Sequence, residues 1–337
     1  MIEELKADLS PELFALLKGT SRSFYLSLRF LPARIRTTLS LAYLLARASD
    51  TIADTNKLAP NGRLKALDEF RQTVQVGGTR VELDECIGAQ AEGAEKKLLI
   101  KTNLILEALK KLPIDHRSLV VDVLQKIIRG QTLDIERFEL QNRIQALPDA
   151  AALDEYTYLV AGCVGEFWTK LCRLEWPNYS SVPDRNLIQT AINFGKGLQL
   201  INIIRDFPAD LQNGRSYLPV SDPEAVVANP ERARLEWDQA RKRATNFLDD
   251  AWNYVVSIRP PRVRFACAVP VLIGVRTLQL LGRETRIRSG IKVSRSEVRK
   301  LIAFALLVGW FPFLEHWIQK RCGISPIKVR AGSADSG

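Results

Sequence analysis

The chain has 337 residues, of which 46% are hydrophobic and 26% are charged, so it is long and apolar enough to bury a sizeable core. Its net charge of +10 suits anionic partners, but the basic residues are spread along the chain, so we expect no nucleic-acid partner. Only His116 and His316 are present, which excludes an HExxH zinc site and disfavours a histidine-based triad. Five cysteines without CxxC spacing indicate buried thiols in a reducing compartment.

Helical periodicity dominates the chain, and strand-like alternation is rare. We predict helices over residues 11–17, 37–54, 94–111, 114–129, 154–174, 186–205, 230–257, 264–281 and 295–318. Pro270 and Pro312 are expected to kink the last two helices. No repeat or shift in composition marks a boundary, so we expect one helical domain over residues 1–324. The tail at 325–337, rich in Gly, Ser and charge, is expected to be disordered.

The longest apolar run covers residues 301–314, which is shorter than the roughly 20 residues that span a bilayer. A buried core helix is the favoured interpretation. A helix docked on a membrane surface is the alternative, because aromatic residues gather at 310–317 after Arg299 and Lys300. The first ten residues lack the apolar core of a signal peptide. We therefore expect a cytoplasmic protein, and the alternative interpretation would place it at the inner face of the membrane through this C-terminal aromatic helix.

Asp50 and Asp54 form the first candidate site. They lie one helical turn apart and share a face with Arg47, at the end of a mostly apolar helix. Two carboxylates held in this way repel each other unless a cation lies between them, and oxygen-only ligands favour Mg²⁺. Such a spacing alone more often marks a solvated surface. The apolar helix before it favours the lining of a cavity.

A polar stripe on a second apolar helix is the stronger signal. Steps of three, four and four residues place Gln199, Asn202, Asp206 and Asp210 on one face among leucines and isoleucines. Polar groups inside a core must be satisfied, either by metal ions and phosphate oxygens or by a buried hydrogen-bond network. Pro208 is expected to kink or end this helix, which would leave Asp210 at the start of a loop.

Two acidic stripes that face each other would bind several Mg²⁺ ions and, through them, a diphosphate leaving group. Arginines would complete the neutralisation of charge, and the candidates are Arg22, Arg47, Arg205 and Arg215. Each of these arginines taken alone is more often a solvated surface residue.

The segment from Tyr156 to Gly165 combines two phenols with small residues at 161, 162 and 165. The phenols are able to exchange a proton. The small residues allow close approach of the backbone, either by a ligand or by a crossing helix.

These segments together resemble the squalene/phytoene synthases, and the similarity extends over about residues 17–306. Residues 21–24 (Ser-Arg-Ser-Phe) resemble the family's opening substrate loop, and residues 50–54 its first aspartate motif. Residues 156–165 are similar to its YCxxVAGxVG segment, with Thr157 in place of the cysteine. Residues 199–219 resemble the second aspartate motif and the loop that follows it.

The resemblance implies an all-α fold, a single-domain bundle around a central cavity, and a prenyltransferase that joins two farnesyl diphosphates head to head. One substrate ionises, the other attacks the cation, and the resulting cyclopropyl diphosphate ionises, rearranges and is quenched. Tyr156 falls where the family places its proton-handling tyrosine. The resemblance implies Mg²⁺ ligation by Asp50, Asp54, Asp206 and Asp210. It implies diphosphate binding by Arg22, Ser23, Tyr43, Arg47, Gln199, Asn202, Arg205 and Arg215.

The product depends on the member of the family. Residues 203–206 are closer to squalene synthases, and Lys292 and Arg295 lie in a segment similar to one that meets NADPH phosphates. Residues 130–134 lean toward phytoene synthases, and Pro208 departs from both. We favour squalene synthesis with NADPH, although no glycine-rich dinucleotide motif is present. A phytoene, dehydrosqualene or hydroxysqualene synthase without reduction is the alternative.

A helical assembly or lipid-binding protein on the same fold is the alternative from another class. Such a protein would have no need of the aspartate pairs, so their presence favours an enzyme.

Overall fold

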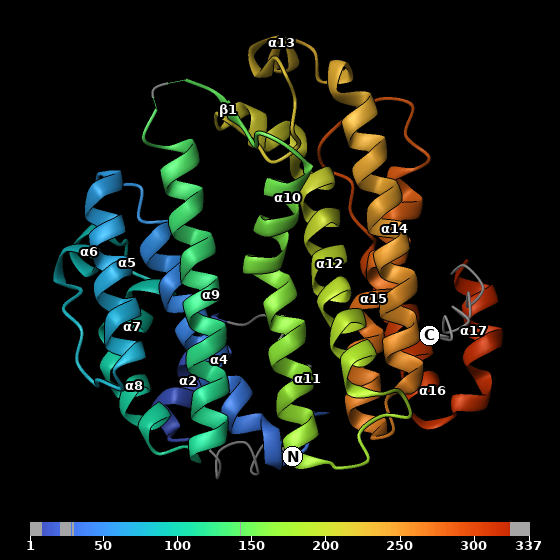
Figure 1. Ribbon diagram of the computed structural model, residues 1–337, viewed down its shortest axis with the longest axis horizontal. Helices are drawn as coiled ribbons and strands as arrows, with labels where there is room; N and C mark the ends of the chain where they lie inside the picture. Colours follow the sequence, from blue (N-terminus) through green and yellow to red (C-terminus); the bar gives the residue numbers. More distant parts are fainter. Residues whose placement is uncertain (1–8, 21–27, 29, 142, 324–337) are drawn as a thin grey trace, which may run out of the picture.

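The computed structural model describes residues 9–20, 28, 30–141 and 143–323, which form a bundle of helices (Figure 1). The α-helices are α2 (Pro11–Thr20), α4 (Ala33–Ala53), α5 (Pro60–Gln75), α6 (Asp84–Ala89), α7 (Ala94–Ile100), α8 (Thr102–Lys110), α9 (Ile114–Phe138), α10 (Ala150–Thr157), α11 (Cys163–Glu175), α12 (Asp184–Gln212), α13 (Pro223–Ala228), α14 (Arg234–Ser257), α15 (Pro261–Leu281), α16 (Arg295–Trp310) and α17 (Glu315–Cys322). The all-helical class predicted from the sequence is confirmed. The tail predicted at 325–337 lies outside the described residues.

The core is organised around α12, which packs against α11, α14 and α15 (Figure 1). Apolar residues cover much of the surface of α12, so the helix buries residues against neighbours on several sides. Across from it, α4 and α9 pack together and bury leucines and isoleucines. The helices that carry the two aspartate pairs are therefore both held by extensive apolar burial.

Two short strands, β1 (Gln145–Ala146) and β2 (Arg215–Ser216), form a parallel pair. Gln145 pairs with Arg215, and Ala146 pairs with Ser216. The pair joins the segment that follows α9 to the segment that follows α12. It thereby fixes the backbone at Arg215, between the two helices that carry the aspartate pairs.

A π-helix at Tyr158–Gly162 separates α10 from α11, where the sequence predicts one helix over 154–174. The predicted close approach occurs here: a Cβ on Gly165 would lie 2.0 Å from the carbonyl oxygen of Ala191 on α12. A Cβ on Gly195 would likewise lie 2.2 Å from the carbonyl oxygen of Ala161. A crossing helix, not a ligand, therefore occupies the space that these small residues leave.

The prediction that Pro208 would leave Asp210 at the start of a loop was wrong. Neither Pro208 nor Pro270 ends its helix, and Asp210 lies within α12 instead of in a loop. Pro208 has no N–H for the carbonyl of Ile204, one turn earlier. The indole Nε1 of Trp237 on α14 donates to that carbonyl oxygen at 2.9 Å, so a neighbouring helix supplies the missing donor. Pro312 follows the prediction better, since α16 ends at Trp310 and a 3₁₀ turn leads into α17.

Other boundaries also differ from the predictions. The predicted helix over 94–111 is divided at Lys101 into α7 and α8. Helix α5 begins at Pro60, outside the helices predicted from the sequence, and proline is well suited to this first helical position. Helix α15 is long enough and, with a mean hydropathy of 1.5, apolar enough to cross a membrane. Two thirds of that apolar stretch is buried inside the bundle, as in a core helix.

Candidate active site

The first aspartate pair lies at the C-terminal end of α4. Asp50 is in the last turn and Asp54 is the C-cap residue, so both carboxylates face the negative end of the helix dipole. Burial raises the pKa of both groups, and the charge of Asp54 raises that of Asp50 further. Gln131 on α9 donates to Asp50 Oδ1 at 2.6 Å, and Arg47 Nη1 lies 3.5 Å from Asp50 Oδ2. The site therefore favours a cation beside this pair.

The second pair lies on α12, where Asp206 and Asp210 are one turn apart as predicted. Arg205 Nε donates to Asp206 Oδ1 at 2.8 Å, so this arginine is already paired with the neighbouring carboxylate. Burial raises the pKa of Asp210 to about 6, and the negative charges of Asp206 and Asp134 contribute. On the same stripe Gln199 is half-buried and Asn202 is exposed.

Arg215 lies between the two pairs. Its positive charge lowers the pKa of Asp54 on α4 and that of Asp210 on α12, opposing the effect of burial. Its Nη1 donates to Asp134 Oδ2 at 3.1 Å. The structure therefore brings both predicted aspartate pairs around one predicted arginine.

Residues on α9 complete the site but were not selected from the sequence. Gln131 and Asp134 are three residues apart on α9, so they share one face of that helix. Polar residues are frequent along this part of α9, so spacing alone does not distinguish these two from solvated residues. Gln131 Oε1 and Asp134 Oδ1 are buried and lack hydrogen-bond partners, so both are available to a ligand.

Arg63 on α5 is a further residue of the site that was not selected from the sequence. Its side chain is 3% exposed, and its Nη1 donates to the carbonyl oxygen of Ala53 at 2.7 Å. It also forms an ion pair with Glu139, the C-cap residue of α9. Arg63 thus joins the ends of α4 and α9 beside Asp54. Its positive charge is favourable there, because the C-terminal end of a helix is the negative end of the helix dipole.

The predicted Tyr156 is buried, with 7% of its surface exposed. Its ring stacks on that of Tyr217, with centroids 4.7 Å apart and planes at 21°. Phe138 packs edge-on against Tyr217 at 5.2 Å. Burial raises the pKa of Tyr156 well above its ordinary value. These aromatic rings form an apolar boundary of the site next to Asp134.

The remaining predicted residues have varied positions. Tyr43 donates its hydroxyl to the carbonyl oxygen of Thr20 at 2.8 Å, and Arg47 Nη2 donates to Glu95 Oε1 at 3.1 Å. Arg22 and Ser23 lie outside the described residues. Lys292 and Arg295 are exposed, just before and at the start of α16, which lies on the far side of the bundle from α9 (Figure 1). In the part of the chain that the structure describes, no ion pair joins them to the aspartate-bearing helices.

The donor set fits Mg²⁺ with a diphosphate as partner. Among the described residues, no three acidic, histidine or cysteine side chains lie close enough to hold a metal ion alone. Mg²⁺ bound with phosphates needs only one or two carboxylates, because phosphate oxygens and water supply the other ligands. The repelling carboxylates and the buried, unpartnered oxygen of Gln131 match that requirement.

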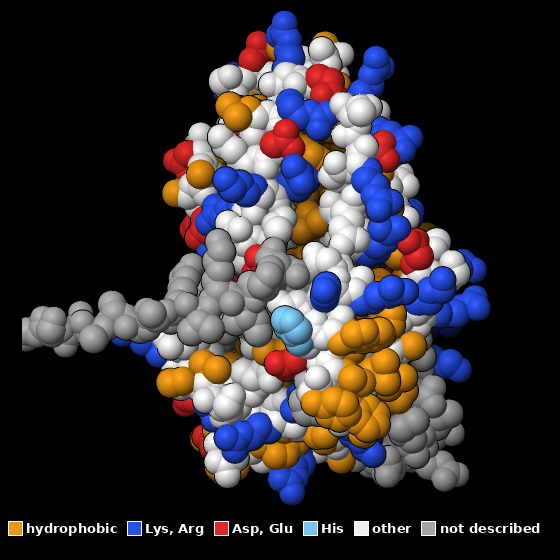
Figure 2. All heavy atoms as spheres, turned by 90° about the vertical axis from the view of Figure 1, so that its right-hand side faces the viewer, with side chains coloured by type: hydrophobic (Ala, Val, Ile, Leu, Met, Phe, Trp, Pro, Cys, Tyr) orange, Lys and Arg blue, Asp and Glu red, His pale blue; other side chains and the backbone are white. Residues whose placement is uncertain are grey.

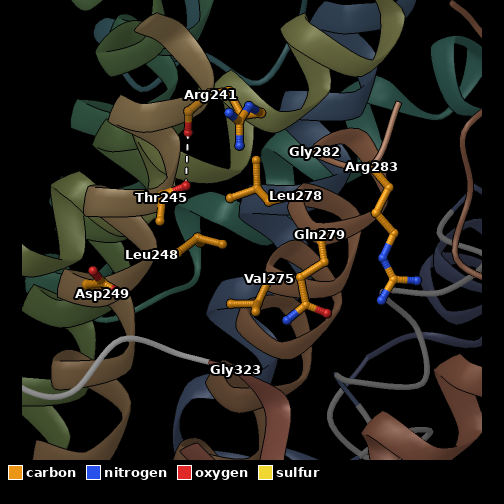
Figure 3. Close-up of a pocket in the computed structure, with 10 residues that line it drawn as sticks. All are labelled: Arg241, Thr245, Leu248, Asp249, Val275, Leu278, Gln279, Gly282, Arg283 and Gly323. Atoms are coloured by element: carbon orange, nitrogen blue, oxygen red, sulfur yellow. Dashed lines mark hydrogen bonds between the residues drawn. The ribbon is translucent and has the colours of Figure 1, made fainter. Parts of the chain in front are cut away.

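Two surface pockets lie away from this site. One, of about 340 Å³, lies between α14 and α15 and is lined by residues such as Arg241, Val275 and Arg283 (Figure 3). The other, of about 380 Å³, is lined by residues of α9, α11 and α12 such as Ser118 and Lys170. Neither pocket contains a predicted site residue.

Asp210→Asn is expected to stabilise the metal-free protein at pH 8 by about 1 kcal/mol, a value reduced for solvent screening of a partly exposed group. The pKa of Asp210 is raised in the fold from 3.8 to about 6, so the charged carboxylate opposes folding above pH 6. The opposition weakens as the pH falls from 6 toward 4, where the folded protein takes up a proton. Urea unfolding without Mg²⁺ at several pH values measures this. An unchanged midpoint at pH 8 would contradict it.

Comparison with known proteins agrees with this geometry. A solved structure of TcSQS in complex with the ligand E5700 superposes with a TM-score of 0.74 at 20% identity, covering 100% of this chain and 94% of that chain. The chain therefore shares an all-helical synthase fold. The model of the squalene/phytoene synthase family matches residues 17–297. The chain belongs to the squalene/phytoene synthase family, which confirms the resemblance and the expectation of a prenyltransferase.

Relatives of two kinds are similar to the chain. It is 28% identical over 324 residues to the squalene synthase of Eremothecium gossypii, covering 91% of this chain and 70% of that protein. It is 28% identical over 308 residues to the bifunctional lycopene cyclase/phytoene synthase of Podospora anserina, covering 83% of this chain and 48% of that protein. Similarity at this level leaves the product open.

Proposed function

We propose that this protein joins two farnesyl diphosphates head to head through a cyclopropyl diphosphate and reduces that intermediate to squalene. One observation carries the proposal: two aspartate pairs on opposed helices both face Arg215, beside a buried tyrosine pair. The similarity to squalene synthases supports farnesyl diphosphate as the substrate. An allylic cation requires exclusion of water, which the apolar packing around the site favours.

The charged residues of the site have separate roles in binding the diphosphate. Asp50, Asp54, Asp206 and Asp210 would hold Mg²⁺, which neutralises the charge of a departing diphosphate. Arg215 adds a fixed positive charge between the pairs, in a partly buried place where it acts strongly. Arg47 and Arg205 are paired with Glu95 and Asp206, and they exchange these partners for phosphate oxygens when substrate binds.

The reductive half of the reaction rests on Lys292 and Arg295. Both are exposed, and Arg295 is the first residue of α16, whose N-terminal backbone N–H groups favour anions. Charge and exposure fit the phosphates of NADPH. Synthesis of phytoene, dehydrosqualene or hydroxysqualene without reduction is the competing function. The similarity to a bifunctional lycopene cyclase/phytoene synthase supports this second candidate.

The test is incubation of the purified protein with farnesyl diphosphate and Mg²⁺, with and without NADPH, followed by mass spectrometry of the products. Squalene is expected only with NADPH, and the cyclopropyl diphosphate is expected without it. A product that is the same in both reactions contradicts the reductive step. No product from farnesyl diphosphate, with turnover of geranylgeranyl diphosphate instead, contradicts the chain length.

We also propose that the C-terminal aromatic segment, residues 310–317 from the end of α16 into α17, contacts an anionic membrane surface at the inner face of the cytoplasmic membrane. Four aromatic side chains there are strongly exposed: Trp310 45%, Phe311 47%, Phe313 78% and Trp317 53%. Figure 2 shows hydrophobic side chains gathered on this face with Lys and Arg beside them. Exposed aromatic groups next to cations suit the headgroup region of anionic lipid. The apolar substrate tail and product give such attachment a use.

Phe313→Ser combined with Trp317→Ser is expected to reduce binding to vesicles of anionic phospholipid by at least about tenfold, because two large apolar groups leave the interface. Cosedimentation measures the bound fraction. Ile114→Ser is the matched control, since Ile114 is 67% exposed but lies on α9. Equal binding by the double variant and the native protein would contradict attachment through this patch.

A further inference from the structure

Three side chains from three separate elements meet at the edge of the active site. Asp134 comes from α9, Tyr156 from α10, and Tyr217 from the segment after β2. One nitrogen, Nη1 of Arg215, lies 3.1 Å from Asp134 Oδ2 and 3.5 Å from the Tyr217 hydroxyl. The carboxylate and this phenol are therefore held together. The stacked rings bring Tyr156 against Tyr217 on the other side.

The pKa effects between these groups agree with one order of donation among them. Burial is the main cause of the raised pKa of both tyrosines. In addition, their mutual hydrogen bond raises the pKa of Tyr156 and lowers that of Tyr217, as expected when Tyr156 donates. Tyr217 and Asp134 affect each other in the corresponding way, with the carboxylate as the acceptor. An order of donation from Tyr156 to Tyr217 to Asp134 is consistent with the stacking of the two rings and with the contact of Arg215 Nη1 with both Asp134 and Tyr217.

This arrangement makes Tyr156 a poor base by itself. Burial raises the pKa of its phenol well above 10, and the nearby negative charge of Asp134 raises it further. A phenolate at this position would be an unpaired buried charge. Yet the proposed first step releases a proton, because two farnesyl diphosphates give one cyclopropyl diphosphate, one diphosphate and one H⁺. The proton needs an acceptor other than a free phenolate.

We propose that Asp134 is the terminal acceptor of a proton relay through Tyr156 and Tyr217. The substrate C–H bond breaks as the cyclopropane closes, and its electron pair forms the ring bond. The proton passes to the Tyr156 oxygen, the Tyr156 hydroxyl proton passes to Tyr217, and the Tyr217 proton passes to Asp134. Both tyrosines are neutral before and after, and a neutral carboxylic acid remains. The buried, unpartnered Oδ1 of Asp134 gives that acid an oxygen free of Arg215. This relay rests on the proposed function.

Other charges surround the acceptor. Arg215 faces Asp134 from β2, Glu139 from the end of α9, and Asp54 from the end of α4. Asp210 faces it from α12. Arg215 favours the carboxylate before the reaction, and Glu139, which is not one of the proposed metal ligands, favours the protonated acid afterwards. The acceptor is therefore poised between its two states.

The test is single-turnover formation of the cyclopropyl diphosphate, measured by rapid quench with Mg²⁺ and without NADPH. Asp134→Asn keeps an oxygen for Arg215 but has no place for the proton, and Tyr217→Phe keeps the stacked ring but removes the relay hydroxyl. Each variant is expected to slow this step by about 10²-fold, with substrate affinity unchanged within about threefold. Tyr158→Phe is the control, because its hydroxyl donates to Glu166 at 2.7 Å, outside the relay. It is expected to keep the native rate.

Solvent deuterium gives a readout that a structural role would not move. The rate of the native protein is expected to fall along a curve as the deuterium fraction rises, because more than one exchangeable proton moves. Tyr217→Phe is expected to give a straight line. Melting temperatures verify that each variant is folded. If only one of the two variants folds, its rate and its deuterium dependence are sufficient to test the relay.

Several outcomes overturn the relay while the proposed function stands. Native rates in both variants would assign the proton to another base, such as the released diphosphate. A slow Asp134→Asn with a native Tyr217→Phe would show that Asp134 acts only through Arg215. A slow Tyr217→Phe with a native Asp134→Asn would remove Asp134 as the acceptor. Absence of any cyclopropyl product from the native protein would instead remove the proposed function, and the relay with it.

Discussion

Asp50→Asn is expected to lower the turnover of farnesyl diphosphate by about 10³-fold, the upper range for loss of one group that stabilises developing charge. Asparagine has nearly the same shape and keeps an oxygen for Gln131, so the hydrogen bond to Asp50 Oδ1 has a replacement. What is lost is the negative charge that would hold Mg²⁺. The helical circular dichroism is expected to stay at the native value, and the melting temperature is expected not to fall, because burial raises the pKa of Asp50 and so opposes the charged form.

Asp68→Asn is the matched control for this prediction. Asp68 lies on α5 with 51% of its side chain exposed, and it pairs with Arg71 at 2.7 Å. It removes the same charge from the surface, away from the site, and is expected to leave turnover within about twofold, as for most surface changes. Native turnover in Asp50→Asn, measured with saturating Mg²⁺, would show that α4 does not carry the metal site.

Gly165→Ala is expected to destabilise the protein by about 3 kcal/mol or more, at the upper end of overpacking effects. The new Cβ would lie 2.0 Å from the carbonyl oxygen of Ala191. Backbone meets backbone there, so relief requires α11 and α12 to move apart. Because α12 carries the second aspartate pair, the same displacement is expected to reduce turnover. Thermal unfolding should show a midpoint lower by about 4 °C or more for a chain of this size.

Gly62→Ala provides the comparison. A Cβ on Gly62 meets nothing within 4 Å, and the residue lies in helix α5. Replacement of a helical glycine that has free space is expected to stabilise the protein by about 0.5–1 kcal/mol. If both variants melt together within about 1 °C, the close crossing of α11 and α12 is not rigid, contrary to the expectation from dense packing.

The sequence was sufficient for the parts of the site that are local. Asp50 with Asp54, and Asp206 with Asp210, are one helical turn apart, so spacing alone places each pair on one face. The partners of these residues lie far along the chain. Gln131 is 81 residues from Asp50, and Asp134 is 81 residues from Arg215. Nothing local distinguishes those polar residues of α9 from solvated ones, so they emerged only from the fold.

The prediction of several helix boundaries failed for the same reason, because contacts with distant parts of the chain decide them. The rule that a proline ends a helix considers the helix alone, whereas α12 passes through Pro208 with the help of an indole from α14. The division at Lys101 and the π-helix before α11 also reflect packing between elements. Local rules located most of the helices, and tertiary contacts decided where several of them end.

The bond from Trp237 to the carbonyl of Ile204 also has a consequence for the order in which these residues can change. While Pro208 is present, Trp237→Phe leaves a buried carbonyl without a donor, at a cost of about 1–3 kcal/mol. Once position 208 has an N–H, the helix supplies its own donor and the indole becomes dispensable. The proline can therefore be lost first and the tryptophan second, while the reverse order passes through a weakened intermediate. During evolution, we therefore expect the loss of Pro208 to precede the loss of Trp237.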